Sequence, residues 1–215
     1  MATFEAVLPG IWTAHYHDID TPEKLQSATK GAPITLVVNA APRQCAARAG
    51  FFGEGIEVLC VDIEDDPDAR KVFDGGRKAA QSTRAAACGE VDIPLRDRCA
   101  GSALVHFDAV GKRMAAARAA GGHVIVHCHA SISRSAAFIL AYAIQHKSYT
   151  LIGALKNMEA KYSATWPCDR FVYELLAHER KCTEGRRIGS KELAAIVGVS
   201  ALLGAAACRV LSLRR

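Results

Sequence analysis

A cysteine and an arginine are separated by five residues in the segment VIVHCHASISRSAAF, Val124–Phe138. The start of this segment is apolar, as in a buried strand, and the residues from Ser135 onward are apolar almost all round, as in a central helix. A loop between a strand and a helix presents free amide groups and the positive end of the helix dipole, which bind anions and favour a thiolate over a thiol. Cys128 would then be a nucleophile, and the planar guanidinium of Arg134 would bind two phosphate oxygens.

The same segment also has two plainer interpretations. A cysteine at the end of a strand is commonly an inert, buried side chain, and the histidines on either side of Cys128 could be metal ligands. Adjacent residues rarely converge on one ion, so we expect no metal at His127 and His129. The spacing of Cys128 and Arg134 therefore favours chemistry on a phosphate ester.

The elements around this loop alternate between strands and helices. Continuous apolar runs predict strands at residues 34–40, 56–63 and 123–127. Caps and helical periodicity predict helices that begin near Pro22, Leu104, Ser135, Leu151 and Asp169. This alternation indicates an α/β fold with a mostly parallel central sheet flanked by helices on both faces.

The segment HCHASISRSA resembles HCxAGxSRSA, the signature of the dual-specificity branch of the cysteine-based protein tyrosine phosphatases. Three further segments are similar to parts of this family. VDIPLRD (residues 91–97) resembles the strand that carries the general acid, LPGIW (8–12) the first strand, and PCDRFVYELLAHE (167–179) the closing helix. The resemblance implies a phosphotyrosine-phosphatase-like fold and the family's activity.

The resemblance also assigns roles to individual residues. Cys128 would attack phosphorus and form a phosphocysteine, Asp97 would protonate the leaving oxygen, and Ser135 would help the thiolate to leave. His127 would orient the loop and tune the cysteine. The phosphate-binding loop would consist of His129, Ala130, Ser131, Ile132, Ser133 and Arg134. Neither a metal nor a cofactor is implied.

Two positions near the loop depart from the family pattern. Ser131 stands where the family has glycine, and Cys168 stands where it has asparagine. If residue 131 requires a positive φ, serine costs about 1 kcal/mol there. Neither change removes a catalytic group, so we expect an active enzyme.

A second segment competes for the general acid. GIEVLCVDIED, residues 55–65, also resembles the strand that leads to the acid. Only Asp97 has the family's spacing to Cys128, so Asp97 is the preferred acid and Asp65, or its neighbour Asp66, is the alternative. The register with Asp97 makes residues of about 66–90 an insertion before the acid strand.

The excess of positive charge lies in the C-terminal part of the chain. The net charge is +5, and residues after 180 hold seven of the 27 basic side chains but only two of the 22 acidic ones. The neutral remainder argues against a nucleic-acid-binding protein. We expect a catalytic domain over residues 1–181, a basic linker over 182–191 and an apolar helix over 192–215, and the scattered cysteines favour a cytoplasmic catalytic domain.

The C-terminal helix has two open interpretations. The sixteen residues from Leu193 to Cys208 carry no charge and would span about 24 Å as a helix, short of a hydrocarbon core of about 30 Å. Continuing to Leu213 would make the segment long enough to cross. It is thus either a tail anchor in a mitochondrial or other intracellular membrane, or a helix packed on the domain or a partner.

The function expected from these patterns is dephosphorylation of phosphotyrosine and phosphoserine or phosphothreonine in protein substrates. One alternative is a phosphatase of the same superfamily that acts on phosphoinositides or other non-protein phosphate monoesters. The loop argues mildly against phosphoinositides, because no lysine or arginine lies between Cys128 and Arg134. The other alternative is an adaptor that binds phosphorylated partners without hydrolysing them.

Overall fold

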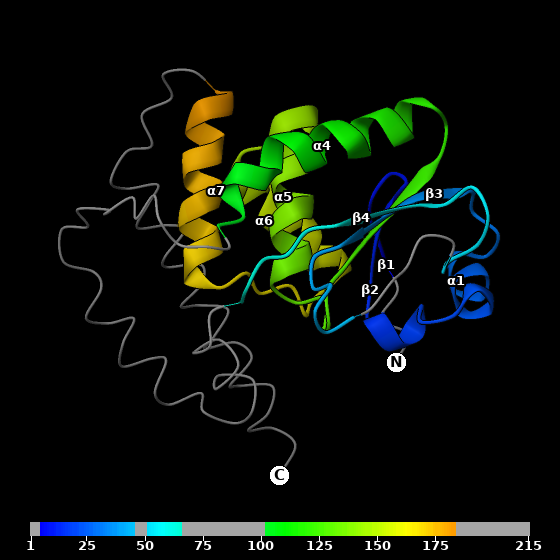
Figure 1. The fold of residues 1–215 in the computed structure, drawn as a ribbon. Coiled ribbons are helices and arrows are strands. Elements are labelled where there is room, and N and C mark those ends of the chain that lie inside the picture. Colours follow the sequence, from blue (N-terminus) through cyan, green and yellow to red (C-terminus); the bar gives the residue numbers. More distant parts are fainter. Residues whose placement is uncertain (1–4, 46–50, 66–101, 184–215) are drawn as a thin grey trace, which may run out of the picture. The chain divides into compact units, whose positions relative to one another are not determined.

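The computed structural model describes residues 5–45, 51–65 and 102–183. Within these residues, five strands form one sheet in the order β1-β2-β5-β3-β4. The strands are β1 (Glu5–Leu8), β2 (Ile11–Ala14), β3 (Ile34–Asn39), β4 (Glu57–Cys60) and β5 (His123–His127). Only β1 runs antiparallel to its neighbour, so the sheet is mostly parallel, as the sequence predicts (Figure 1).

The central strand β5 positions the loop that follows it. It lies between β2 and β3, and the side chains of Val124, Ile125 and Val126 have no exposed surface. Such a strand is covered on both faces, which explains its continuous apolar sequence. Its last residue, His127, pairs with Asn39 at the end of β3, so the two strands end at the same edge of the sheet.

Five α-helices and one short 3-10 helix surround the sheet in the described part of the chain. They are η1 (Tyr16–Asp18), α1 (Pro22–Thr29), α4 (Leu104–Ala119), α5 (Arg134–Lys147), α6 (Leu151–Lys161) and α7 (Asp169–Cys182). Side-chain caps begin α1 and α6, because the hydroxyls of Thr21 and Thr150 accept hydrogen bonds from the N–H groups of Lys24 and Gly153. All five α-helices thus match the helices expected from the sequence.

Both faces of the sheet are covered. Leu25 of α1 packs in a cluster with Val37 and Ile125, whereas the helices from α4 to α7 gather on the other side (Figure 1). Side chains alternate between the two faces of a strand, and Leu36 and Val38 are buried as completely as Val37. The helix α5 is buried on every side from Ala136 to Ile144, as its sequence predicts.

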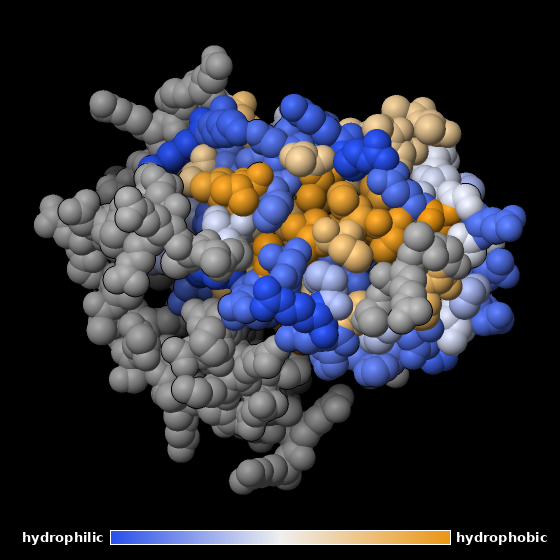
Figure 2. All heavy atoms as spheres, in the orientation of Figure 1, coloured by the Kyte–Doolittle hydropathy of each residue, from blue (hydrophilic) through white to orange (hydrophobic). Residues whose placement is uncertain are grey.

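Two predicted strands differ in detail from the observed ones. The segment LPGIW is a turn between two strands rather than one strand, because Gly10 adopts φ +69° and reverses the chain from β1 to β2. The strand β4 is shorter than the run at 56–63. It is half exposed because it lies at the edge of the sheet, and apolar surface is visible over β4 and the facing side of α4 in Figure 2.

Several predicted features lie outside the described residues. These are the insertion at about 66–90, the strand at 91–97 with Asp97, almost all of the linker at 182–191 and the C-terminal helix at 192–215. They remain predictions. Among the residues that the structure describes, no helix is both long and apolar enough to cross a membrane.

Candidate active site

The loop from Cys128 to Ser133 joins the buried end of β5 directly to the first residue of α5. Both residues of the predicted pair are buried, with Cys128 2% exposed and Arg134 5% exposed. The hydroxyl of Ser135 lies 3.6 Å from the Cys128 sulfur. The structure thus brings the thiol of Cys128, the guanidinium of Arg134 and the hydroxyl of Ser135 together at a helix N-terminus, where amide groups and the helix dipole favour a bound anion.

Ser131 occupies a left-handed backbone conformation, with φ +52°. The condition under which serine at this position is strained is therefore met. Its hydroxyl donates a hydrogen bond to the backbone carbonyl of Ala14, the last residue of β2. A glycine could not form this contact, so the hydrogen bond offsets part of the conformational cost of serine.

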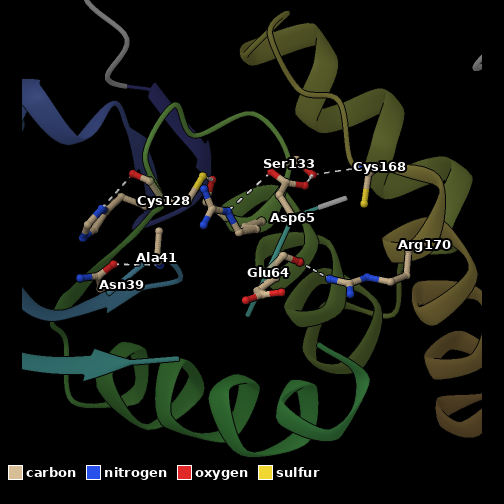
Figure 3. A network of polar contacts seen from close by, with 11 residues as sticks. Asn39, Ala41, Glu64, Asp65, Cys128, Ser133, Cys168 and Arg170 are labelled. Carbon is tan, nitrogen blue, oxygen red and sulfur yellow. Dashed lines mark hydrogen bonds and ion pairs between the residues drawn. The ribbon is translucent and has the colours of Figure 1, made fainter. Parts of the chain in front are cut away.

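A carboxylate lies against the loop, and it belongs to Asp65. Its Oδ1 accepts a hydrogen bond of 2.8 Å from the Ser133 hydroxyl, and its Oδ2 lies 3.6 Å from Nε of Arg134 (Figure 3). Nε of Arg134 is buried and makes no hydrogen bond within the described residues. A buried donor of this kind is costly unless it is paired, so it favours an additional anion at the loop.

This arrangement bears on the choice between the two acids. Asp65, the alternative in the sequence, is the carboxylate that the structure places at the loop, and its side chain is 15% exposed. Asp97 and Asp66 lie outside the described residues. The assignment of Asp97 therefore stays a prediction, and Asp65 has direct contacts in its favour.

The segment before α7 supports the loop through its backbone. The N–H of Cys168 donates to the Ser133 hydroxyl at 3.2 Å (Figure 3), and the N–H of Trp166 donates to the carbonyl of Ile132 at 2.9 Å. A backbone donor does not depend on the side chain of its residue, so the contact to Ser133 does not require an asparagine at position 168. The Ser133 hydroxyl accepts this hydrogen bond from Cys168 and donates one to Asp65. The N–H of Cys168 therefore helps to orient the hydroxyl toward Asp65.

His127 is fully buried below the loop. Its Nδ1 lies 3.2 Å from the carbonyl oxygen of Cys128, and its ring stacks on Tyr16 at 5.8 Å. Burial lowers the pKa of His127 to about 4, so the ring is neutral at neutral pH. A carbonyl can only accept, so Nδ1 carries the proton. These contacts fit the predicted orienting role, but a neutral ring supplies no positive charge to the cysteine.

Sequence reasoning missed Cys45, which is fully buried. Burial is the main cause that raises the pKa of Cys45 to about 11; the neighbouring Cys128 also raises it, and the positive charge of Arg134 opposes the rise. Asn39, at the end of β3, donates to the carbonyl of Cys45 at 2.6 Å. No sequence motif marks this cysteine, because tertiary structure alone places it near the loop.

Comparisons with known proteins identify a phosphatase family that matches this chain. The chain matches the model of the family described as "Dual specificity phosphatase, catalytic domain" over residues 72–181. This range contains Asp97 but not Asp65.

Two relatives match over stretches of different length. The chain is 32% identical over 178 residues to rat dual specificity protein phosphatase 12, a match that covers 80% of the chain and 42% of the relative. It is 32% identical over 96 residues to human protein phosphatase Slingshot homolog 3, covering 45% of the chain and 15% of the relative. The chain therefore spans less than half the length of these relatives.

A solved structure has the same fold. The crystal structure of human DUSP28 superposes with a TM-score of 0.62 at 22% identity, covering 85% of this chain and 97% of that one. Identity at this level shows similarity of fold only.

Proposed function

Because the chain belongs to the dual specificity phosphatase family, we propose that it hydrolyses phosphotyrosine and phosphoserine or phosphothreonine in proteins through a phosphocysteine. The observation that carries this proposal is the buried pair of Cys128 and Arg134 at the N-terminus of α5, with a guanidinium donor that has no hydrogen bond among the described residues. The proposal assigns the three roles that phosphate ester transfer requires: a nucleophile, an anion-binding loop and a carboxyl group that donates a proton when it is protonated.

In the first step, the Cys128 thiolate forms a bond to phosphorus while the bond from phosphorus to the leaving oxygen breaks. The loop amides and Arg134 hold the equatorial oxygens, on which negative charge accumulates. The acid transfers its proton to the leaving oxygen, so the product leaves as a neutral alcohol or phenol. Asp65 is the acid that we propose, because its carboxylate lies against Ser133 and Arg134.

In the second step, water attacks the phosphocysteine and the same carboxylate accepts its proton. The bond from phosphorus to sulfur breaks, and inorganic phosphate and the thiolate are released. The Ser135 hydroxyl, 3.6 Å from the sulfur, donates a hydrogen bond to the thiolate as it leaves. No metal takes part in either step of this proposal.

The proposal is tested with the purified full chain and Cys128→Ser on phosphotyrosyl and phosphothreonyl peptides. We expect turnover of both by the wild type and none by the variant, and Cys60→Ser, at an exposed cysteine on β4, should retain full activity. If the wild type hydrolyses no phosphate ester faster than the Cys128→Ser variant does, the proposal that the protein is an enzyme is wrong. Binding of phosphopeptides by the wild type without turnover would favour the adaptor.

The same preparation separates the substrate classes and the acids. Faster turnover of phosphoinositides than of phosphopeptides would favour the non-protein alternative. Asp65→Asn should lower the turnover of substrates with poor leaving groups about 100-fold, whereas Asp97→Asn should have little effect. The reverse result would restore Asp97 as the acid.

For the C-terminal residues, the tail anchor remains a proposal that rests on the uncharged run of residues 193–208. We expect the full chain to float with phospholipid vesicles and the variant with Ile196→Lys and Leu202→Lys to remain at the bottom of the gradient. Equal behaviour of the two proteins would contradict the anchor and favour a helix packed on the domain or on a partner.

A further inference from the structure

The five residues 61–65, here called the acid-bearing segment, lead from the end of β4 to Asp65. Burial alternates along it: Val61 and Ile63 are 5% and 1% exposed, whereas Asp62 and Glu64 are exposed. In an extended chain, successive side chains point to opposite sides. Asp65 therefore points to the side of the two buried residues, toward the loop, while Asp62 and Glu64 face outward.

The outward face of the acid-bearing segment is held by Arg43, which follows β3. Its Nε and Nη2 lie 2.8 and 2.7 Å from Oδ2 of Asp62, and its Nη1 lies 3.1 Å from Oε1 of Glu64. One guanidinium thus bridges the two outward carboxylates. The Arg43 side chain is 69% exposed, so water screens these contacts and their effect is small.

Arg170 holds the backbone of the same segment. Its Nη2 donates to the carbonyl oxygen of Glu64, the oxygen of the peptide bond that joins Glu64 to Asp65 (Figure 3). A peptide bond is planar, so fixing its oxygen also fixes the direction in which the chain enters Asp65.

Arg170 is itself well anchored. It lies in the first turn of α7, and its guanidinium carbon is 4.8 Å from the centroid of the Phe171 ring, which has no exposed surface. A guanidinium over a buried ring in a helix loses little freedom when it binds the carbonyl. The contact from Arg170 is therefore more rigid than that from Arg43.

We propose that Arg170 is a positioning residue for proton transfer, which holds the carboxyl of Asp65 over the phosphate-binding loop, with Arg43 as a weaker second support. This inference rests on the proposed function and on Asp65 as the acid. Proton transfer depends on hydrogen-bond geometry to the leaving oxygen, so a looser segment slows the reactions that need the proton most. Arg170 acts through Asp65 and does not touch the reacting atoms.

The test compares Arg170→Met with Arg170→Lys in the full chain. Both replacements keep a long side chain over Phe171, but only lysine retains a donor for the carbonyl. The substrates are phenyl phosphate, which has a poor leaving group, and p-nitrophenyl phosphate, which has a good one. The control is Arg113→Met, because Arg113 pairs with Glu57 at the opposite end of β4.

We expect Arg170→Met to lower kcat/KM about 10-fold for phenyl phosphate and at most about 2-fold for p-nitrophenyl phosphate. Arg170→Lys should recover most of the loss, and Arg113→Met should match the wild type on both substrates. In an Asp65→Asn background, Arg170→Met should add no further loss, because both changes act on the same proton.

Three results would overturn the inference. Equal losses on the two substrates would show a general structural or binding role, and so would a further loss in the Asp65→Asn background. If the wild type is active and the Asp65→Asn variant is equally active, the inference is wrong but the proposed function still holds. An inactive wild type would instead contradict the proposed function itself.

Discussion

The serine at position 131 leads to a prediction with a definite order of stabilities. Ser131→Ala keeps a Cβ atom in the left-handed conformation at φ +52° and removes the hydrogen bond to the Ala14 carbonyl. Ser131→Gly also removes the hydrogen bond but relieves the conformational strain. The two variants thus separate two effects that are combined in the native protein.

The magnitudes follow from these contacts. A buried hydrogen bond stabilises by about 1 kcal/mol, and the left-handed conformation costs a residue with a Cβ atom about 1 kcal/mol or somewhat more. Ser131→Ala should therefore lower the free energy of unfolding by about 1 kcal/mol. In Ser131→Gly the two changes nearly cancel, so its stability should lie within about 0.5 kcal/mol of the wild type.

The assay is urea unfolding followed by tryptophan fluorescence. It is well placed to detect changes at the loop, because the backbone of Trp166 bonds the carbonyl of Ile132. Thermal unfolding should show the alanine variant about 2–4 °C below the wild type. If Ser131→Ala is as stable as the wild type, or more stable than Ser131→Gly, then the contact with Ala14 does not offset the strain and the reasoning fails.

Three further predictions concern other residues. Burial lowers the pKa of His127 to about 4, so only the unfolded chain binds a proton there between pH 6.5 and 4. Stability should thus fall by about 3 kcal/mol as the pH drops through this window, and urea titrations should show a shallower fall for His127→Asn. With a buried thiol and a pKa of about 11, Cys45 should remain unlabelled by iodoacetamide at pH 7.5 while exposed Cys60 reacts, as peptide mass spectrometry would show; equal labelling would contradict the burial. Arg43→Ala should lower the free energy of unfolding in urea by less than about 1 kcal/mol, since its ion pairs are exposed.

The residues that we propose to act on phosphate could be identified in the sequence because they lie within one short segment. Five residues separate Cys128 from Arg134, and they lie between an apolar strand and an apolar helix. This local pattern predicts a loop at a helix N-terminus and does not depend on how distant segments of the chain fold. Local signals also predicted the helices, since the caps Thr21 and Thr150 act within one turn of their own chain.

The acid could not be determined in the same way, because its position depends on contacts between segments far apart in the chain. Two segments carry the same strand-and-aspartate pattern, and spacing to Cys128 favoured Asp97. Only the tertiary structure shows Asp65 against Ser133 and Arg134, 68 residues away from Ser133 in sequence. Loop lengths vary at little thermodynamic cost, so spacing along the chain is a weaker guide than contact in the fold.

The sequence by itself thus determined the helices, a mostly parallel sheet, and the strand-loop-helix segment that carries the proposed nucleophile and phosphate-binding loop, because each follows from periodicity or from neighbours within a few residues. Tertiary structure alone decided the partners of that loop. Ala14 from β2 accepts the hydroxyl of Ser131, and Arg170 from α7 holds the segment that carries Asp65. These contacts join residues more than a hundred positions apart, and only the packing of sheet and helices brings them within hydrogen-bonding distance.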